Sequence, residues 1–316
     1  MTNKQIIVLG ANPSWQKTLF FESLTQGKVN RAIQEENYSS GKGVNFCRAL
    51  RCSKLANSTL FQFAGGINGE RLCKGLDAEG FHHTTIKTES ETRCCITCLD
   101  KAGNMTELIG KSSPLLPEES SAMLTALYTV IDQKPGLLAI TGSLPDGSNP
   151  DLYFQTAKYA SAAKVPVLID ALVTIKEIMT LPGKMILKVN KEEFLKIFPA
   201  DNIKTAHKNA LHQFPDKVFA VTDGGGNATL SYCGKLFNYT LPPVKVVSPL
   251  GAGDTASAVM AALYAGGSVP EEAFLQSLAA ASANCETDIA GNYSPARAAE
   301  ISKMITIGTI PLEGSV

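Results

Sequence analysis

Apolar residues recur along the chain in short, nearly uninterrupted runs. The runs are IIVLG (6–10), CCITCL (94–99), LLAITG (137–142), VPVLID (165–170), MILKVN (185–190) and VFAVTDGG (218–225). Short runs without alternation are typical of strands that are covered on both faces. The pattern therefore predicts several buried strands spread over the whole chain.

Segments with helical patterns lie between these runs. They are NPDLYFQTAKYASAA (149–163), with Asn149 as its cap and Pro150 in the first turn, KEEFLKIF (191–198) and TASAVMAALYAGG (255–267). Alternation of strand and helix predicts an α/β fold, with a mostly parallel sheet and helices on both faces. Ligands of such folds bind at the carboxyl ends of the strands. We therefore expect a site in the loops after residues 10, 142, 170, 190 and 222, and in the loop 249–254.

Two regions break the alternation. From Thr18 to Asn37, and from Arg93 to Ile109, strand-like patterns follow one another without helices. KTLFFESL, KVNRAIQEE and RCCITCLDKAGNMTELIG are typical of antiparallel hairpins, with KAGN as the turn of the last. We expect a small β subdomain, from about 16–38 and 93–110, within a single domain that spans 1–316.

Charge and composition narrow the class of function. Lysine plus arginine and aspartate plus glutamate both number 29. This balance argues against nucleic-acid or membrane-surface binding driven by net charge, although a local basic pocket remains compatible with it. No run approaches a membrane span, and IIVLG is too short for the core of a signal peptide. With eight cysteines expected to stay reduced, we expect a cytoplasmic protein.

Cys94, Cys95 and Cys98, with His82 and His83 upstream, invite a metal interpretation. A strand would place Cys95 and Cys98 on opposite faces, and the chain has no second Cys-x-x-Cys. We therefore expect packing cysteines and no metal site here.

The stretch VVSPLGAGDTASA allows two interpretations. In the structural one, Asp254 caps a helix by accepting a backbone N–H of Ala256 or Ser257. That helix would be amphipathic and bury Ala256, Val259, Met260, Leu263 and Tyr264. In the functional one, Gly251 and Gly253 let free N–H groups approach an anion, and Asp254 is a general base beside them.

Other polar motifs fall where the topology places a site. Gly41-Lys42-Gly43 precedes Asn45 and a helical run, without the spacing of a Walker A loop. Gly142 and Ser143 follow one strand. Asn190 and Glu193 span a strand-to-helix turn, and three glycines follow Asp223.

Together these motifs resemble the ribokinase-like (PfkB) carbohydrate kinases over nearly the whole chain. The shared marks, in order, are ANPSWQKT, VNRA, SGKGVNFCRAL, AGGINGE, TRCCITCLD with NMTEL, ITGSLP, LKVNKEE and PLGAGDTASA. The branch most similar to it contains 1-phosphofructokinase, the minor 6-phosphofructokinase and tagatose-6-phosphate kinase. The inserted β region then resembles the lid of that family, which often forms a homodimer interface.

The resemblance implies roles around the phosphoryl group. Asp254 matches the catalytic base that deprotonates the attacking sugar hydroxyl. The backbone N–H groups of Gly251, Ala252 and Gly253 match an anion hole for the transferred phosphoryl. Lys188 matches a phosphate-facing lysine.

It also implies ATP and Mg²⁺ as cofactors. Asn190 and Glu193 match the element that organises Mg²⁺, largely through water. Thr222 and Gly224 match the nucleotide loop, in which Asp223 and Gly225 depart from the usual TLGA.

For the sugar, the resemblance implies binding by Gly41, Lys42, Asn45 and Ser143. Arg31 and Arg93 match positions that hold a substrate phosphate, a task that suits the arginine fork. Ion pairing within the lid is the alternative for each arginine.

One position departs from the branch. Gln16 stands where the branch has an aspartate that grips sugar hydroxyls, so an acceptor remains but its charge is lost. Trp15 beside it either packs the lid, which we favour, or stacks on a sugar.

We therefore expect an ATP-dependent kinase of a sugar phosphate of the fructose or tagatose type. Two alternatives remain open: a kinase of an unphosphorylated sugar, and a catalytically weak sugar-binding protein on the same fold. A nicotinamide-dependent dehydrogenase is disfavoured, because VLGANPS lacks Gly-x-Gly-x-x-Gly.

Overall fold

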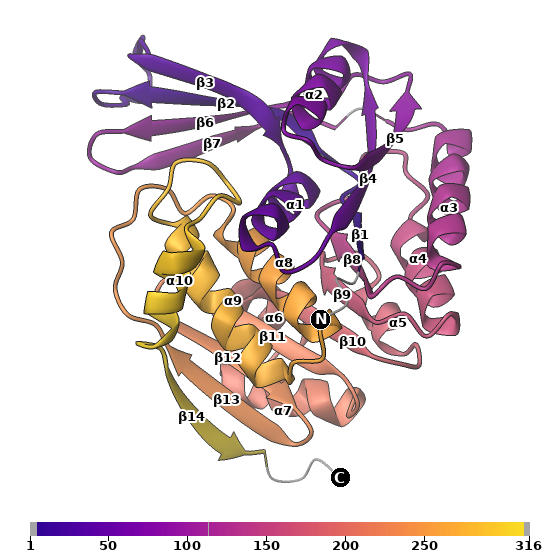
Figure 1. Cartoon of the computed structure of the whole chain (residues 1–316). Coiled ribbons are helices and arrows are strands. Elements are labelled where there is room, and N and C mark those ends of the chain that lie inside the picture. The colour runs from indigo at the N-terminus through magenta and orange to yellow at the C-terminus, as the bar shows by residue number, and fades with distance from the viewer. Residues whose placement is uncertain (1–4, 113, 313–316) are drawn as a thin grey trace.

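The computed structural model describes residues 5–112 and 114–312, and it contains two β-sheets flanked by helices (Figure 1). The strands are β1 (Ile6–Leu9), β2 (Ser14–Phe21), β3 (Gln34–Ser40), β4 (Ser58–Gly65), β5 (His83–Thr88), β6 (Cys94–Asp100), β7 (Met105–Ile109), β8 (Leu137–Thr141), β9 (Val167–Asp170), β10 (Met185–Asn190), β11 (Val218–Asp223), β12 (Asn227–Tyr232), β13 (Lys235–Thr240) and β14 (Thr306–Pro311). The helices are α1 (Lys42–Ser53), α2 (Gly66–Ala78), α3 (Pro117–Ile131), α4 (Leu152–Ala162), α5 (Ile175–Met179), α6 (Lys191–Ile197), α7 (Ile203–Gln213), α8 (Ala252–Ala265), α9 (Pro270–Asn284) and α10 (Pro295–Ser302).

The large sheet has the strand order β14-β13-β12-β11-β10-β9-β8-β1-β4-β5. Strands from β5 to β11 pair in parallel, whereas β12, β13 and β14 add an antiparallel edge. The order reverses at β1, which pairs with β4 on one side and β8 on the other. A crevice outside the carboxyl ends of the strands is expected at such a switch point.

Apolar side chains form one layer on each face of this sheet. The first layer joins the sheet to α1, α8, α9 and α10, through residues such as Phe46, Met260 and Phe274. The second joins it to α3, α4, α5, α6 and α7, through residues such as Tyr153 and Phe194. Strands such as β1 are buried along their whole length because both faces are covered. The expected α/β fold is confirmed.

The small sheet has the order β3-β2-β6-β7 and projects from one end of the body (Figure 1). Its two hairpins are antiparallel, as expected, but β2 and β6 join them in parallel. The prediction of strand structure from Lys28 onward was wrong, because β3 begins only at Gln34. Asn30 instead bonds the backbone of Thr25 and Lys28, which folds this segment into a loop of its own.

Two helix starts differ from the sequence expectation. Helix α8 begins at Ala252, after Gly251 in the left-handed region (φ 80°). Asp254 is therefore the third helical residue, not the cap, and the helix is buried almost all round instead of being amphipathic, with Leu263 and Tyr264 only partly buried. Helix α4 begins at Leu152, because the Asn149 side chain accepts the Asp151 N–H and closes a turn first.

The eight cysteines carry free thiols, and Cys95 and Cys98 are both buried in the small sheet. Within residues 5–112 and 114–312, no group of three or more His, Cys, Asp or Glu side chains could hold a metal ion. Over the same residues, the helices are all too short or too polar to cross a membrane.

Candidate active site

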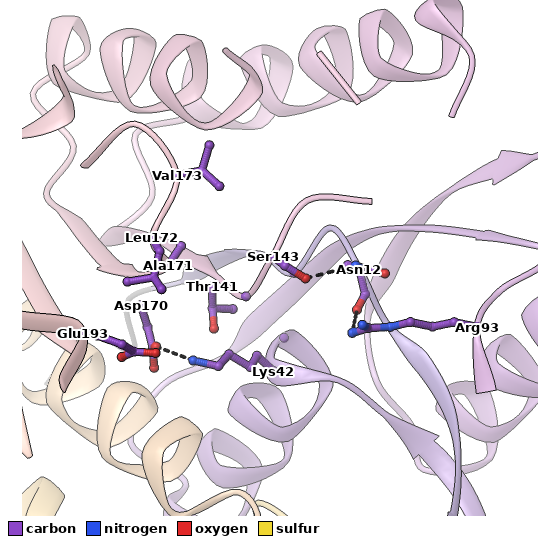
Figure 2. Close-up of a pocket in the computed structure, with 13 residues that line it drawn as sticks. Asn12, Lys42, Arg93, Thr141, Ser143, Asp170, Ala171, Leu172, Val173 and Glu193 are labelled. Carbon is purple, nitrogen blue, oxygen red and sulfur yellow. Dashed lines mark hydrogen bonds and ion pairs between the residues drawn. The ribbon is translucent and has the colours of Figure 1, made fainter. Parts of the chain in front are cut away.

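Two adjoining cavities open at the carboxyl ends of the strands. The inner cavity, of about 310 Å³, lies at the ends of β1, β8 and β9 (Figure 2). The lid cavity, of about 550 Å³, lies between the small sheet and the beginnings of α1 and α8. Both are lined by Lys42, Arg93, Asp170 and Glu193. Their volumes are typical of small-molecule sites.

Asp254 lies buried on the wall of the lid cavity, in the first turn of α8. Its Oδ2 accepts a hydrogen bond of 2.8 Å from Nδ2 of Asn45, which lies 209 positions earlier in the chain. Asn45 is oriented in turn by Arg48, whose Nη1 lies 3.4 Å from Asn45 Oδ1, and by Ser40. The carboxylate is thus held in place without a direct ion pair.

Asp170, at the end of β9, is the centre of the charged groups between the cavities. Its Oδ1 lies 2.7 Å from Lys42 Nζ, and its Oδ2 lies 3.3 Å from Lys188 Nζ and 2.6 Å from Ser257 Oγ. Figure 2 shows Lys42 directed at Asp170. One buried carboxylate therefore joins α1, β10 and α8.

The surroundings of the two aspartates shift their pKa values in opposite directions. Burial raises the pKa of Asp254 above its ordinary value, and Lys42, its strongest charged neighbour, offsets this only in part. Burial acts on Asp170 too, but Lys188 and Lys42 outweigh it and hold the pKa of Asp170 well below its usual range. The carboxylates of Asp170 and Asp254 likewise hold the pKa of Lys42 above its ordinary value, against the effect of burial. Asp254 is therefore the better proton acceptor of the two near neutral pH.

The turn from Gly251 to Gly253 lies beside Asp254. Gly251 and Gly253 line the lid cavity, and Lys188 Nζ donates to the Gly253 carbonyl at 2.9 Å. N–H groups at the start of a helix have no intrahelical acceptor and can bind an anion. Here the Ala252 N–H donates to the Pro249 carbonyl at 3.3 Å, which among the described residues leaves those of Gly251 and Gly253 for a ligand. The structure thus brings together Asp254, the turn and Lys188, as expected from the sequence.

Asn190 and Glu193 form a reciprocal capping box at the start of α6. The Glu193 N–H donates to Asn190 Oδ1 at 2.9 Å, and the Asn190 N–H donates to Glu193 Oε2 at 3.0 Å. Both residues line the lid cavity, and Asn190 Nδ2 and Glu193 Oε1 keep their hydrogen-bonding capacity. A single free carboxylate oxygen fits Mg²⁺, which keeps several waters and is held mainly by substrate phosphates.

Gln16 is buried in the small sheet and faces the lid cavity. Its Nε2 donates to Thr97 Oγ1 at 2.9 Å and to the Lys17 carbonyl at 3.1 Å. These bonds leave Oε1 as the atom that a ligand can use, so the position offers an uncharged acceptor. Trp15 is partly buried and packs against the apolar layer that joins the large sheet to α1, α8, α9 and α10, so it packs as favoured from the sequence.

The remaining substrate candidates divide between the two cavities. Gly41 and Asn45 line the lid cavity, Ser143 lines the inner cavity, and Lys42 lines both. Arg93 also lines both, with Nη2 donating to the Asn12 carbonyl at 2.9 Å. The Asn12 side chain donates to Ser143 Oγ at 3.0 Å, which ties the ends of β1 and β8 together (Figure 2).

Two candidates lie apart from these cavities. Arg31 is exposed in the loop between β2 and β3, three positions before β3 begins at Gln34. Strand β3 reaches the lid cavity only at its other end, where Ser40 lines the cavity. Because a strand rises about 3.3 Å per residue, Arg31 lies far from the lid cavity. Gly224 is in the open turn after β11, while its neighbour Thr222 does line the cavity. The fold therefore does not bring Arg31 to the site of its own chain.

Sequence reasoning missed Asp170, Asn12 and Ser257. Asp170 ends the run VPVLID, and the loop after it was selected by topology, so its position as the last residue of a buried strand is a usable signal. Ser257 gives no such signal, because only the packing of α8 against β9 makes it a partner of Asp170.

Comparison with known proteins supports this picture. A family model for pfkB family carbohydrate kinases matches residues 12–297. The phosphofructokinase-2 of Escherichia coli, solved in complex with potassium, superposes with a TM-score of 0.86 at 21% identity, covering 95% of this chain and 99% of that one. The same enzyme in complex with fructose-6-phosphate gives a TM-score of 0.84 at 20% identity, with the same coverage.

A Thermotoga maritima protein described as a possible 1-phosphofructokinase gives a TM-score of 0.83 at 17% identity, covering 97% of this chain and 99% of that one. At such identities these structures establish the shared fold alone. The family match spans most of the chain, so the protein belongs to the pfkB family of carbohydrate kinases, which are phosphotransferases that use ATP.

Proposed function

We propose that the protein transfers the γ-phosphoryl group of ATP to a hydroxyl of a sugar phosphate of the fructose or tagatose type, with Asp254 as general base. The observation that carries this proposal is the placement of Asp254. It is a buried carboxylate of raised pKa, open to a cavity that lysines line, and next to a turn in which the N–H groups of Gly251 and Gly253 have no acceptor in the described part of the chain.

In this reaction an Oδ atom of Asp254 takes the proton of the sugar hydroxyl. The hydroxyl oxygen then forms a bond to the γ-phosphorus, the bond from that phosphorus to the bridging β–γ oxygen breaks, and ADP leaves with the electron pair. Asp254 later releases its proton to solvent. Asn45 holds the carboxylate for this transfer through its 2.8 Å hydrogen bond.

The N–H groups of Gly251, Ala252 and Gly253 stabilise the charge that develops on the transferred group. Lys188 and Thr222 bind the nucleotide end within the lid cavity, and Gly224 would contact the nucleotide only where it extends out of that cavity to the turn after β11. Bound Mg²⁺, held through Asn190, Glu193 and water, supplies neutralisation of phosphate charge. These assignments are supported by the position of Lys188, Thr222, Asn190 and Glu193 on one cavity wall.

A phosphate on the sugar is supported by the inner cavity. Lys42 and Arg93 bring positive charge to it, although Asp170 pairs with Lys42 and Glu193 also lines the cavity. Asn12 and Ser143 add neutral polar groups. Gly41, Asn45 and Gln16, on the lid cavity, would face the sugar hydroxyls.

One observation favours a second candidate, a kinase of an unphosphorylated sugar. Arg31 lies outside the site, and the Arg93 guanidinium already donates to the carbonyls of Asn12 and Pro13. Gln16 also lacks the charge with which a carboxylate would grip hydroxyls. This candidate predicts turnover on free sugars only.

We also propose that two copies associate through the small sheet and that the protein acts in the cytoplasm. Exposed apolar residues on that sheet support the first proposal, and eight free thiols are compatible with the reducing compartment of the second.

The decisive experiment compares the wild-type protein with Asp254→Asn on a panel of acceptors, with ATP and Mg²⁺. The panel holds fructose 1-phosphate, fructose 6-phosphate, tagatose 6-phosphate, fructose, ribose and a nucleoside. Loss of the base should lower kcat by about 10²- to 10⁴-fold with little change in KM. Asp132→Asn, at an exposed position away from both cavities, is the matched control. Undiminished turnover by Asp254→Asn would refute the role of Asp254, and turnover on free sugars alone would favour the second candidate.

A further inference from the structure

Asn284 is the last residue of α9, and it is completely buried behind the turn that contains Gly251. Its Oδ1 accepts from Thr255 Oγ1 at 2.7 Å and from the Gly291 N–H at 3.0 Å. Its Nδ2 donates to the Leu250 carbonyl at 3.2 Å. The Asn284 side chain thus bonds Leu250, Thr255 and Gly291. Leu250 and Thr255 flank the segment from Gly251 to Asp254, and Gly291 belongs to a third segment.

The bond to Leu250 determines where the next N–H points. In a planar trans peptide the carbonyl and the following N–H point in opposite directions. Because Asn284 holds the Leu250 carbonyl on the buried side, the N–H of Gly251 points away from Asn284, toward the lid cavity that Gly251 lines. In the described part of the chain no protein group accepts this N–H, so it is available to a ligand.

The third segment fixes the same turn from another side. A Cβ added to Gly251 would lie 2.6 Å from Gly291 N, and one added to Gly291 would lie 2.3 Å from the carbonyl oxygen of Asn45. Gly291 is therefore wedged between the turn and the residue that orients Asp254. By accepting the Gly291 N–H, Asn284 fixes the position of Gly291 as well as that of the Leu250 carbonyl.

We infer that Asn284 is a positioning residue that directs the Gly251 N–H at the phosphoryl group in the transition state. This inference rests on the proposed function, since it assigns a task to the anion-binding turn. On the opposite side, Lys188 holds the Gly253 carbonyl, so the turn is fixed at both ends before substrate arrives. Donors that are fixed in advance need no rearrangement during the reaction.

The chemistry of the side chain separates this role from simple packing. A buried amide loses its hydration and is tolerated only when its polar atoms are bonded. Replacing it by a group that keeps the two acceptor contacts, but cannot donate to Leu250, tests the inference directly.

Asn284→Asp is that variant when it is assayed at a pH above the pKa of the introduced carboxyl, which burial raises, because the ionised carboxylate accepts from Thr255 and Gly291 but repels the Leu250 carbonyl, whereas the protonated acid could still donate to it. We expect kcat to fall about 10- to 100-fold, somewhat less than for complete loss of an oxyanion donor, while KM for sugar and for ATP changes by less than about threefold. Thr255→Val is the matched control, since it removes one contact of Asn284 and leaves the bond to Leu250. It should retain kcat within about threefold of wild type.

A second variant covers the case in which Asn284→Asp does not fold. Asn284→Ser creates no buried charge and is too short to reach Leu250, so it should show the same loss of kcat at conserved KM. Wild-type kcat in either folded variant would overturn the inference, and so would an equal loss in Thr255→Val.

A crystal structure of the variant separates this inference from the proposed function. If the wild-type protein phosphorylates no acceptor, the proposed function fails on its own account. The direction of the Leu250 carbonyl still decides the positioning role: a turned peptide in Asn284→Asp or Asn284→Ser supports it, and an unchanged peptide overturns it.

Discussion

Asp170 and Asp254 are two buried aspartates with opposite electrostatic surroundings. Two lysines keep Asp170 ionised, whereas among the described residues the Asn45 amide is the side chain that bonds Asp254 directly. Pairs of titratable groups whose pKa values are pushed apart commonly divide acid–base tasks between them. Asp170 accordingly fixes the positions of the Lys42 and Lys188 side chains, whereas Asp254 can exchange a proton.

Removing the charge of Asp170 should change the pH dependence of the reaction. The Asp170 carboxylate raises the pKa of Asp254, so Asp170→Asn should lower that pKa. A base with a lower pKa is ionised at lower pH, so the acidic limb of kcat/KM should move to lower pH, while the plateau falls because Lys42 and Lys188 lose their partner. The measurement is kcat/KM between about pH 5 and 9. A limb that stays in place or moves to higher pH contradicts the electrostatic coupling, and Asp132→Asn should leave both limb and plateau unchanged.

At this scale the sequence identified residues that belong to a local motif. Asp254, Lys42, Asn190 and Glu193 stand in short patterns with a recognisable spacing, and all four line one cavity. Asn284 stands in no such pattern, because its partners Leu250 and Gly291 are chosen by the packing of α9 against α8. Residues that act through tertiary contacts alone leave no local signal.

At the scale of elements, one histidine provides hydrogen bonds between α7 and the antiparallel edge of the large sheet. His207 is fully buried on α7 and bonds Ser231 Oγ at 2.7 Å and Thr229 Oγ1 at 2.8 Å, both on β12. Burial lowers the pKa of His207 to about 3. The folded protein therefore keeps this imidazole neutral where an unfolded chain would protonate it.

This difference predicts a loss of stability in mild acid. Below the ordinary histidine pKa of about 6.5, the unfolded state binds a proton that the folded state refuses, so the free energy of unfolding falls as pH falls. The contribution of His207 should approach about 1.4 kcal/mol per pH unit, down to its folded pKa. His207→Gln keeps a donor and an acceptor but cannot titrate, so it should flatten this slope.

Urea unfolding at about pH 7, 6 and 5 measures the slope. His212→Gln, at an exposed position on the same helix, should keep the wild-type dependence. An equal slope in wild type and His207→Gln would show that other groups cause the acid sensitivity.

The boundaries of elements were predicted well where side chains alone decide them. The run MILKVN corresponds to β10 residue for residue. Helix α8 starts earlier than expected, because a left-handed glycine and not a polar cap begins it. The edge strands β12, β13 and β14 pair one after another beyond β11, and no local sequence pattern records that pairing.

At the scale of the whole molecule, the small sheet carries an exposed apolar surface. Val29 and Ile33, in the loop before β3, are 81% and 56% exposed, and Leu108 on β7 is 55% exposed. Arg31 lies between the first two. These residues belong to the two opposite edges of the small sheet, and exposed apolar side chains can mark interaction sites, which is the basis of the proposed dimer.

Leu108→Glu should dissociate this dimer. A charge on each copy would have to be buried in the interface, so we expect a monomer where the wild type is a dimer. Sedimentation at micromolar concentrations measures the mass. Met304→Glu, which alters an apolar side chain of similar exposure (47%) away from the small sheet, should stay dimeric. A monomeric wild type, or a dimeric Leu108→Glu, contradicts association through this surface.

The ordered motifs predicted the family, and the buried apolar runs that alternate with helical patterns predicted the α/β fold. ITGSLP and LKVNKEE, for example, contain the ends of β8 and β10, whose apolar runs are visible in the sequence. They did not predict how the small sheet is assembled. The parallel pairing of β2 with β6 joins residues such as Gln16 and Cys95 across a long stretch of chain, and pairing at that range depends on the finished fold.

The long separation between the two sides of the site has a consequence for synthesis. Asn45 and Asp254 are 209 positions apart, and the Arg48 side chain donates to the Ala290 carbonyl, 242 positions away. A ribosome that has released Asn45 has most of the chain still to make before Asp254 exists. A nascent or truncated chain that ends before α9 lacks Asn284 and its bonds to Leu250 and Gly291, so the proposed activity should require nearly the whole chain.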